Sequence, residues 1–409
     1  MRFGDHVVMF NLGRIPMIGN LNNGFTIGLT SQGASLCARI YDLNITDEEA
    51  QRQDPELFAA LRENDFLNEE KSEMQLRTAY LHVTQRCNLN CRGCYSLDDS
   101  RNALDDAPTA KMKKAVDELV SAGCESLFIS GGEPFMRADL PEIIEYAKRQ
   151  GIERITLITN GTHIQREILE QMASFVDVVA VSFDGYSSSS PAHIRSAQRF
   201  DELVAAIALI KEAGISAHIT PTIHAKNVHD LQRYAELASS LGTTMNYSLL
   251  SCAYTDGLSD LIPSEKDLEL LGTSLLGLGA SPSFSGSPFG ANLNVNLNCG
   301  AGAREISIAA DGTVYPCHML HRPEWVLGNV FEEHLPDILA NEKALTLKSL
   351  NVEEFEHCGD CCYKFLCGGG CRARSLFRYG DLNHQDAYCT MNRSYFGNLE
   401  KALNQHLAL

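Results

Sequence analysis

The run Cys87-Asn-Leu-Asn-Cys91-Arg-Gly-Cys94-Tyr95 places three cysteines close together in the spacing C-x3-C-x2-C. It directly follows the apolar stretch 78–84, which we expect to form a buried strand. A [4Fe–4S] cluster is normally held by four cysteine thiolates, so three thiolates on one loop leave one iron open to a ligand that is not protein. A structural zinc site is the alternative, but it usually takes four protein ligands and often uses paired C-x2-C knuckles.

This spacing, with the aromatic Tyr95 after the third cysteine, resembles the signature of the radical S-adenosylmethionine (SAM) enzymes. In that family the open iron binds the amino and carboxylate groups of SAM, and an electron from the cluster cleaves SAM to a 5′-deoxyadenosyl radical. The resemblance implies that Cys87, Cys91 and Cys94 bind this cluster. It also implies a protein electron donor, such as flavodoxin or ferredoxin.

Length and composition set the outer bounds of the interpretation. At 409 residues the chain exceeds the size at which one core stops growing, so two or three domains are expected. The first residues do not resemble a signal peptide, and no apolar run is long enough to span a membrane, so we expect a cytoplasmic protein with no membrane partner. In a reducing compartment, fourteen cysteines indicate metal binding or catalysis rather than disulfides. The net charge of −18 argues against nucleic acid as a partner.

Residues 77–250 alternate short β-branched runs with longer amphipathic ones. This order predicts parallel β/α units, whose functional loops lie at the carboxyl ends of the strands. The expected strands are 78–84, 126–130, 154–159, 176–183, 215–222 and 243–250, and the clearest helices are 108–122, 140–149, 200–213 and 228–241. Six units are too few for a complete eight-stranded barrel, and the resemblance implies an α/β fold with a partial (β/α)6 barrel.

Gly131-Gly132-Glu133-Pro134 follows the second expected strand. Glycines allow close backbone approach to a ligand, and a carboxylate can accept hydrogen bonds from an ammonium group. Alone this sequence is usually an ordinary turn. In a chain that also carries C-x3-C-x2-C, it is similar to the GGEP motif that binds the SAM amino group.

The next two strands end in polar residues that resemble further SAM-binding segments of the family, with Asn160 in TNG and Ser182 and Asp184 in S-x-DG. The resemblance implies that Ser182 contacts the ribose or the methionine carboxylate of SAM. Asp184 can instead cap the local turn, which is common for Asp before Gly. Arg195 is the candidate partner of the SAM carboxylate, because a planar guanidinium binds carboxylates in a bidentate manner. The histidine and aspartate of the family's HDxxR-type segment are missing here, so a solvated loop arginine is the alternative.

The C-terminal third carries a second cysteine system. Its spacing is C-x9–15-G-x4-C, then C-x2-C-x5-C-x3-C, then a last C, and this resembles the pattern of the SPASM extension. The resemblance implies two auxiliary [4Fe–4S] clusters. The resemblance places Cys358, Cys361, Cys367 and Cys389 on an outer cluster, and Cys299, Cys317 and Cys371 on an inner one. With the SAM-binding cluster, this makes three clusters in total. Zinc ligation by the C-x2-C pair is the alternative.

The inner cluster is then one thiolate short. Cys252 can complete it, or the site can stay open for a substrate thiol or water. Cys362 is a poorer candidate, because adjacent side chains in an extended segment point in opposite directions. Cys37 and Cys124 lie in apolar surroundings and are expected to be buried small hydrophobes.

The first 75 or so residues have a different pattern. Short strands are expected at 7–11, 16–20 and 24–30 around the hairpin signal Asn23-Gly24, followed by helices at 31–41 and 55–64. This order resembles the small winged-helix element with which many peptide-modifying radical SAM enzymes capture a precursor peptide by strand addition. A structural N-terminal cap is the alternative.

The expected domains are therefore 1–75 for peptide recognition, 76–255 for the SAM barrel and 256–409 for a linker and the SPASM part. The resemblance implies a maturase that abstracts a hydrogen atom from a ribosomally made peptide or protein, leading to a thioether or carbon–carbon crosslink, oxidation or epimerisation. An anaerobic sulfatase maturase shares the cluster pattern, but its members place an aspartate where this chain has His318. A haem- or redox-cofactor-maturing SPASM enzyme also fits. An iron–sulfur electron carrier is the alternative from another class, and it leaves GGEP and the barrel without purpose. No catalytic acid or base is assigned.

Overall fold

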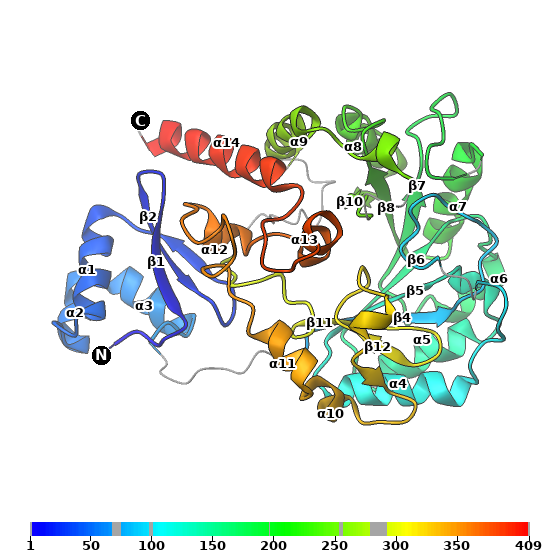
Figure 1. The fold of residues 1–409 in the computed structure, drawn as a ribbon, viewed down its shortest axis with the longest axis horizontal. Coiled ribbons are helices and arrows are strands. Elements are labelled where there is room, and N and C mark those ends of the chain that lie inside the picture. Colours follow the sequence, from blue (N-terminus) through cyan, green and yellow to red (C-terminus); the bar gives the residue numbers. More distant parts are fainter. Residues whose placement is uncertain are drawn as a thin grey trace.

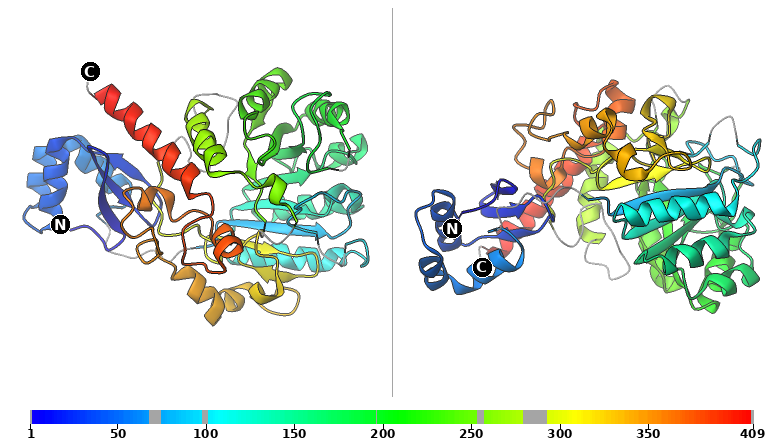
Figure 2. Two further views of the ribbon diagram at one scale, coloured as in Figure 1. Left: turned by 45° about the horizontal axis from the view of Figure 1, so that its top comes forward. Right: turned by 90° about the horizontal axis from the view of Figure 1, so that it is seen from below.

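The computed structural model describes residues 2–67, 75–97, 101–195, 197–252, 257–278 and 293–407. In Figure 1 the N-terminal domain (blue) lies at one end and the barrel (cyan to green) at the other, with the C-terminal segments (yellow to red) between them. The two views of Figure 2 show the same order. The middle position of the C-terminal part is also seen in contacts, because Phe10 of the N-terminal domain packs against Phe365 at a ring distance of 5.8 Å.

The N-terminal domain is a three-stranded antiparallel sheet covered by three helices. The strands are β1 (Val7–Leu12), β2 (Ile15–Asn20) and β3 (Thr26–Gly28), in the order β1-β2-β3. The helices are α1 (Ser31–Tyr41), α2 (Asp47–Gln53) and α3 (Pro55–Glu63). The expected hairpins and two of the three helices are confirmed. Helix α2 was missed, although Thr46 and Glu49 form a capping box that the sequence already displays.

The barrel is an open parallel sheet whose strands follow one another in chain order. Its first five strands are β4 (Thr78–Thr84), β5 (Ser126–Gly131), β6 (Arg154–Thr159), β7 (Val178–Phe183) and β8 (Ser216–Ile223). The helices between them are α4 (Thr109–Ser121), α5 (Leu140–Arg149), α6 (Arg166–Met172), α7 (Phe200–Glu212) and α8 (Leu231–Leu241). Every neighbouring pair from β4 to β8 is parallel, so the expected β/α architecture is confirmed.

The sixth expected strand is broken into two short pieces. These are β9 (Thr244–Met245) and β10 (Ser248–Leu249), and both pair parallel with β8. The pieces flank Asn246 and Tyr247, and the Asn246 amide N–H donates to the Ile219 carbonyl at 3.3 Å. The barrel therefore ends in an irregular edge, close to the loop that carries Cys252.

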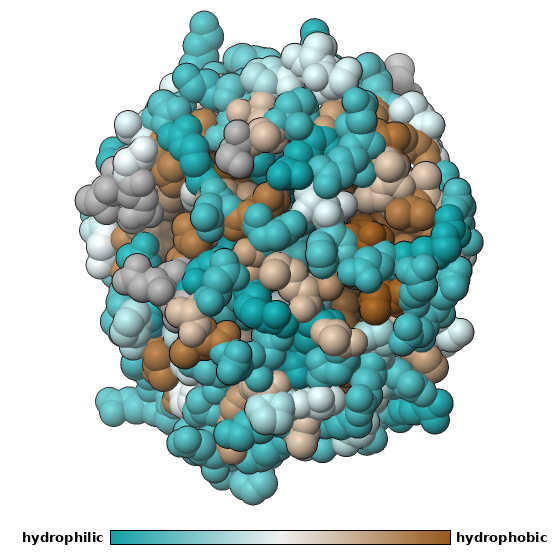
Figure 3. Space-filling model, turned by 90° about the vertical axis from the view of Figure 1, so that its right-hand side faces the viewer, coloured by the Kyte–Doolittle hydropathy of each residue, from teal (hydrophilic) through white to brown (hydrophobic). Residues whose placement is uncertain are grey.

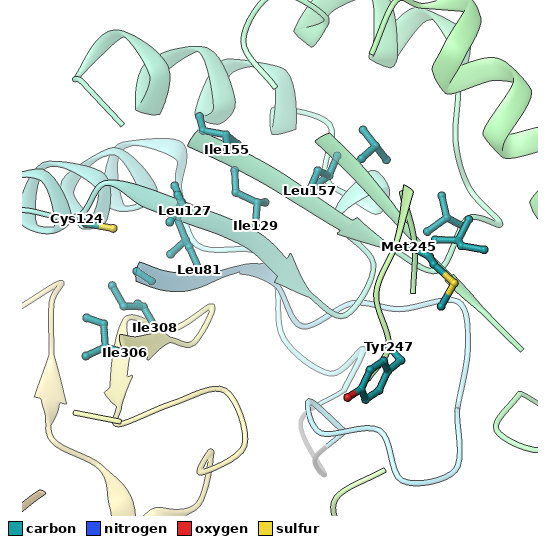
Figure 4. Close-up of a cluster of buried hydrophobic side chains, with 14 of the residues drawn as sticks. Leu81, Cys124, Leu127, Ile129, Ile155, Leu157, Met245, Tyr247, Ile306 and Ile308 are labelled. Atoms are coloured by element: carbon teal, nitrogen blue, oxygen red, sulfur yellow. The ribbon is translucent and has the colours of Figure 1, made fainter. Parts of the chain in front are cut away.

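Alternate residues of the strands point away from the barrel interior and pack beneath the helices, as the period-two geometry of strands requires. Figure 4 shows Leu81, Leu127, Ile129, Ile155 and Leu157 from neighbouring strands within this core. Each of these side chains is at most 1% exposed. Cys37 and Cys124 are buried as expected for small hydrophobes, and burial raises the pKa of each thiol to about 12.

The C-terminal part extends the barrel sheet. Strand β11 (Glu305–Ile308) pairs parallel with β4, and β12 (Thr313–Tyr315) and β13 (Gly328–Asn329) continue the sheet in antiparallel fashion. Figure 4 shows Ile306 and Ile308 of β11 near Leu81 of β4. The expected boundary at residue 255 thus separates segments of the sequence, but one continuous sheet runs across it.

The remaining helices are α9 (Glu265–Leu278), α10 (Leu335–Leu339), α11 (Glu342–Lys348), α12 (Lys364–Cys367), α13 (Arg372–Tyr379) and α14 (Cys389–Leu407). Helices α9 and α14 lie against each other, as Figure 1 also shows. A Cβ on Gly272 would come within 2.3 Å of the Met391 carbonyl oxygen, so glycine permits this close contact.

On the face shown in Figure 3, hydrophilic side chains predominate, and hydrophobic ones gather in patches between them. None of the described helices is long and apolar enough to cross a membrane.

Candidate SAM and iron–sulfur sites

The three cysteines of the C-x3-C-x2-C loop lie directly beyond the carboxyl end of β4. The thiols of Cys87 and Cys94 are close enough to that of Cys91 to raise its pKa, and burial is the larger cause of its rise to about 11. Several thiols held this close cannot all ionise without a cation among them. Iron would supply that charge, so this donor set fits a cluster.

Neighbouring side chains hold this loop and point N–H groups at its sulfurs. Asn102 accepts the Cys87 amide N–H at 2.9 Å and donates to the Cys87 carbonyl at 3.0 Å. The Leu89 amide reaches the Cys87 sulfur at 3.4 Å, and Arg101 reaches the Cys94 sulfur at 3.8 Å. Hydrogen bonds to cluster sulfurs are a means by which proteins tune cluster potentials. Sequence reasoning missed Arg101 and Asn102, because no local pattern links them to the cysteines.

The GGEP turn packs on the chain that leads into the cysteine loop. A Cβ on Gly131 would come within 2.3 Å of the Thr84 carbonyl oxygen, and one on Gly132 within 2.1 Å of the Arg86 carbonyl oxygen. Only glycine fits at either position. The close approach that we expected toward a ligand is therefore made, in this structure, toward the backbone of residues 84–86.

Glu133 is fully buried at the junction of β5 and β6. Its carboxylate accepts hydrogen bonds from the Thr159 hydroxyl and the Asn160 amide, each at 2.8 Å, and from the Phe135 amide at 3.1 Å. Burial is the main cause that raises the pKa of Glu133. Pro134 begins the short 3-10 turn Pro134–Met136 directly after it.

The other predicted SAM contacts surround the same strand ends. The Tyr95 hydroxyl bonds the Ser130 hydroxyl at 2.7 Å, and burial raises the pKa of Tyr95 to about 12. The side-chain amide of Asn160 donates to the side-chain oxygen of Asn88 at 2.9 Å and approaches the Cys87 sulfur at 3.9 Å. The structure thus brings the third strand end against the cysteine loop.

Asp184 caps the loop that carries Arg195, nine to eleven residues further along the chain, whereas the alternative interpretation had it cap the local turn. Its carboxylate accepts amide N–H groups of His193, Ile194 and Arg195, the last at 2.8 Å. The Arg195 guanidinium donates to the Ser182 carbonyl at 2.6 Å, and its Nε is buried without a partner among the described residues. Arg195 is only 8% exposed, so it is not a solvated loop arginine.

The Arg195 guanidinium lies close enough to Cys91, Glu133 and Asp184 for these groups to affect its pKa. Burial lowers the pKa of Arg195, and these three groups oppose the shift. A buried guanidinium with an unpartnered N–H beside the cysteine loop can bind a carboxylate. This arrangement fits the amino acid end of SAM.

Four C-terminal thiols share one cavity. Cys358, Cys361, Cys367 and Cys389 line the same cavity beside the amino-terminal end of α14. Burial raises the pKa of Cys367 to about 12 and that of Cys389 to about 11. The four residues that we assigned to the outer cluster are thus brought together, in a number that suits a cubane.

Cys299, Cys317 and Cys371 form a second group, in which the other two thiols add to the burial that raises the pKa of Cys317. Cys252 lies instead in a smaller cavity, which Arg374 and Tyr388 also line. Arg374 is also one of the charges that act on Cys371. The two interpretations of the fourth ligand therefore both remain predictions.

Aromatic and histidine side chains connect Tyr95, which follows Cys94, with His318, which follows Cys317, and sequence reasoning missed the other members of this group. The His82 ring lies 4.5 Å from the His321 ring and 5.7 Å from the Tyr95 ring. His318, which follows Cys317, lies 3.4 Å from the Glu305 carboxylate and stacks near Tyr80. Burial keeps the pKa of His82 well below its usual value, so this ring is neutral.

Two family models match the chain. The radical SAM superfamily model covers residues 81–238, and the SPASM model, described as an iron–sulfur cluster-binding domain, covers residues 299–362. The first takes in most of β4, the cysteine loop and strands β5 to β8, and it ends before β9 and β10. The second begins at Cys299, and the later cysteines at 367, 371 and 389 lie beyond its end.

Curated relatives are similar over about three quarters of the chain. The AdoMet-dependent heme synthase of Methanosarcina barkeri is 28% identical over 334 residues, which cover 75% of this chain and 94% of the relative. The mycofactocin maturase MftC of Mycobacterium tuberculosis is 29% identical over 325 residues, covering 76% of this chain and 82% of the relative. The subtilosin biosynthesis protein AlbA of Bacillus subtilis is 27% identical over 305 residues, covering 71% of this chain and 66% of AlbA.

Solved structures share the fold at low identity. The protein anSMEcpe with bound AdoMet has a TM-score of 0.66 at 18% identity and covers 81% of this chain and 96% of its own. Streptococcus suis SuiB bound to precursor peptide SuiA has a TM-score of 0.63 at 14% identity and covers 95% of this chain and 99% of its own. With both family models matched and the barrel in place, the chain is a radical SAM enzyme that carries a C-terminal SPASM iron–sulfur domain.

Proposed function

We propose that this enzyme cleaves SAM at Cys87, Cys91 and Cys94 and uses the resulting radical to modify a ribosomally made precursor peptide. When bound, the cluster and SAM supply the radical chemistry. The chain itself supplies the thiols, the Arg195 guanidinium and an N-terminal domain ahead of the barrel. We assign peptide recognition to the N-terminal domain, as residues 1–75 were assigned from the sequence.

The observation that carries the peptide proposal is the free edge of β3. The Leu29 amide donates to the Pro16 carbonyl, and the Asn20 amide to the Phe25 carbonyl, each at 2.8 Å. By alternation, the backbone groups of Thr26 and Gly28 point away from β2. No described strand pairs with the outer edge at residues 26–28, and just before it the Gly24 carbonyl accepts the Val295 amide at 3.0 Å.

An edge strand with unpaired backbone groups is a template for an added peptide strand. Phe25, which is 43% exposed and packs edge-on against Phe66, adds an apolar anchor at the start of this edge. The likeness to SuiB, solved with a precursor peptide, extends over 95% of this chain and so includes residues beyond the barrel. MftC and AlbA, whose names describe a maturase and a bacteriocin biosynthesis protein, support the same assignment.

A haem-pathway substrate is the second candidate, because a heme synthase and an Fe-coproporphyrin III synthase are among the relatives. The test uses enzyme reconstituted without oxygen, reduced with dithionite and supplied with SAM. One arm receives a short peptide encoded beside the gene, and the other receives Fe-coproporphyrin III. A peptide mass change that requires SAM and the three cysteines supports the proposal, whereas conversion of the porphyrin alone refutes it.

A matched pair of variants tests the edge itself. Replacing Gly28 by Pro removes one outward N–H group, and replacing Met9 by Pro does the same on the opposite edge strand, β1. We expect G28P to weaken binding of the peptide at least tenfold, while M9P leaves it within twofold. Equal loss in both variants would assign the effect to the fold of the sheet rather than to peptide pairing.

A further inference from the structure

Two imidazoles and a carboxylate converge next to the outer thiols. Glu356 lies 3.3 Å from His357 Nε2 through Oε1, and 3.8 Å from His384 Nε2 through Oε2. The potential ligand atoms of these three residues all lie within 4.8 Å of one another. Ligands of a tetrahedral ion such as Zn²⁺ lie about 3.4 Å apart, given a metal–ligand distance of about 2.1 Å. Small side-chain rotations therefore bring the three donors into coordination distance.

The structure holds these donors in place from several sides. The Glu356 amide N–H donates to the Asn383 carbonyl at 2.7 Å, which ties the two loops together. The His384 carbonyl accepts from Arg372 at 2.7 Å and from the Ser375 hydroxyl at 3.0 Å. The His384 ring also stacks on Tyr379 at 3.7 Å. Fixed donors lose less conformational entropy when they bind an ion.

Charge and access favour a cation at this place. The stretch 353–360, Glu-Glu-Phe-Glu-His-Cys-Gly-Asp, carries four carboxylates, and Lys364 pairs with Glu353 among them. The side chains of Glu356 and His357 are 62% and 56% exposed, so an ion can reach them from solvent. Two imidazoles and one carboxylate suit first-row divalent ions, whereas Mg²⁺ and Ca²⁺ prefer oxygen ligands alone.

We propose that Glu356, His357 and His384 form a binding site for a first-row divalent cation such as Zn²⁺, and that the ion crosslinks the two loops around the outer thiols. His357 directly precedes Cys358 and lines the outer cavity itself. His384 lies in the loop that leads to Cys389. An ion held by both histidines joins a loop with two outer thiols to the loop that leads to a third.

The test measures Zn²⁺ binding to the fully reconstituted, oxidised holoenzyme against a chromophoric zinc chelator. A Cys362→Ser background removes the exposed neighbouring thiol. The test variants are His384→Gln and Glu356→Gln, with His357→Gln as the replacement if either fails to fold. The matched control is His229→Gln, which removes another exposed histidine that lies 3.5 Å from a carboxylate, that of Asp267.

We expect one Zn²⁺ per chain in the background protein and at least tenfold weaker binding in each test variant, which corresponds to about 1.4 kcal/mol. His229→Gln should bind like the background protein, and millimolar Mg²⁺ should not compete. Zn²⁺ should raise the thermal midpoint of the background protein but not that of His384→Gln. Equal zinc affinity in background, test and control proteins means adventitious surface binding only and overturns the proposal. If Zn²⁺ binding is lost in the test variants but Zn²⁺ does not raise the thermal midpoint of the background protein, the ion does not crosslink the two loops.

Discussion

Replacing Asp184 by Ala should disorder the loop that presents Arg195, although Asp184 itself makes no contact that requires SAM. Its carboxylate is 6% exposed and accepts three consecutive amide N–H groups, from residues 193 to 195. A hydrogen bond to a charged group contributes about 1.5–3 kcal/mol net. The three bonds share one carboxylate and are not additive, so we expect local opening of this loop to become easier by about 3 kcal/mol.

Hydrogen exchange followed by mass spectrometry measures that opening directly. A change of about 3 kcal/mol corresponds to roughly 100-fold faster exchange of the amides at 193–195. Loss of the fixed guanidinium should also weaken SAM binding at least tenfold. The Asp184→Asn variant keeps one acceptor oxygen, so its SAM affinity and its exchange rate at 193–195 should lie between those of the unmodified enzyme and of Asp184→Ala.

Asp177→Ala is the matched control, because Asp177 precedes the other end of β7. Its carboxylate accepts the Ile155 amide at 2.7 Å and pairs with Lys148 at 2.8 Å. This variant should leave SAM affinity and exchange at 193–195 unchanged. If Asp184→Ala also leaves both quantities unchanged, Asp184 does not position Arg195, and the reasoning fails.

The remaining predictions concern the clusters and the pH dependence of stability. Replacing Cys87, Cys91 and Cys94 together by Ala should abolish dithionite-dependent 5′-deoxyadenosine formation and lower the iron content from about twelve to about eight atoms per chain. Undiminished SAM cleavage contradicts the assignment of these three cysteines, and zinc in the C-terminal sites contradicts the assignment of the auxiliary clusters. Cys252→Ala should keep its full iron content and spectrum if the inner site is open, whereas loss of one cluster identifies Cys252 as the fourth ligand. Burial lowers the pKa of His224 from 6.5 to about 4, so between these values the unfolded state binds a proton that the folded state excludes, and stability falls as pH falls. Between pH 7.5 and 5.5 the resulting loss of unfolding free energy is up to about 1.3 kcal/mol. The His224→Gln variant should lack this loss, and His229→Gln should keep it. Equal pH profiles of stability for the two variants would contradict the assignment to His224.

The parallel strands could be predicted because each is a continuous apolar run bounded by polar residues, which is a local signal. The sixth strand was predicted as one element from the same signal. Its division at Asn246 and Tyr247 depends on tertiary pairing with β8, which the local pattern does not contain. The parallel pairing of β11 with β4 joins residues more than 200 positions apart, and no local feature announces it.

At the cysteine sites, too, features with a local sequence signal could be predicted and features that depend on tertiary structure could not. Motif spacing predicted which thiols would gather, because the cysteines of each group lie on short loops or recur in a fixed order. Asn102 and Arg101 were missed because they reach the cysteine loop from a segment whose role depends on how that segment folds back. Asp184 was identified as a candidate, but only the structure reveals that its partners are backbone amides rather than a ligand.

The inner site marks the limit of motif reasoning most clearly. Asp386 is buried, accepts the Cys371 amide at 2.7 Å and pairs with Arg374 at 2.6 Å. The same Arg374 lines the cavity that contains Cys252. Burial raises the pKa of Cys371, and the charges of Arg374 and Asp386 shift it in opposite directions. Because Arg374 is already paired with Asp386, its charge does not select between a Cys252 thiolate and an anionic group of a substrate. Spacing identifies ligands that are close in sequence, whereas this choice depends on a cavity that forms only when the loop after β10 meets the segment after α13.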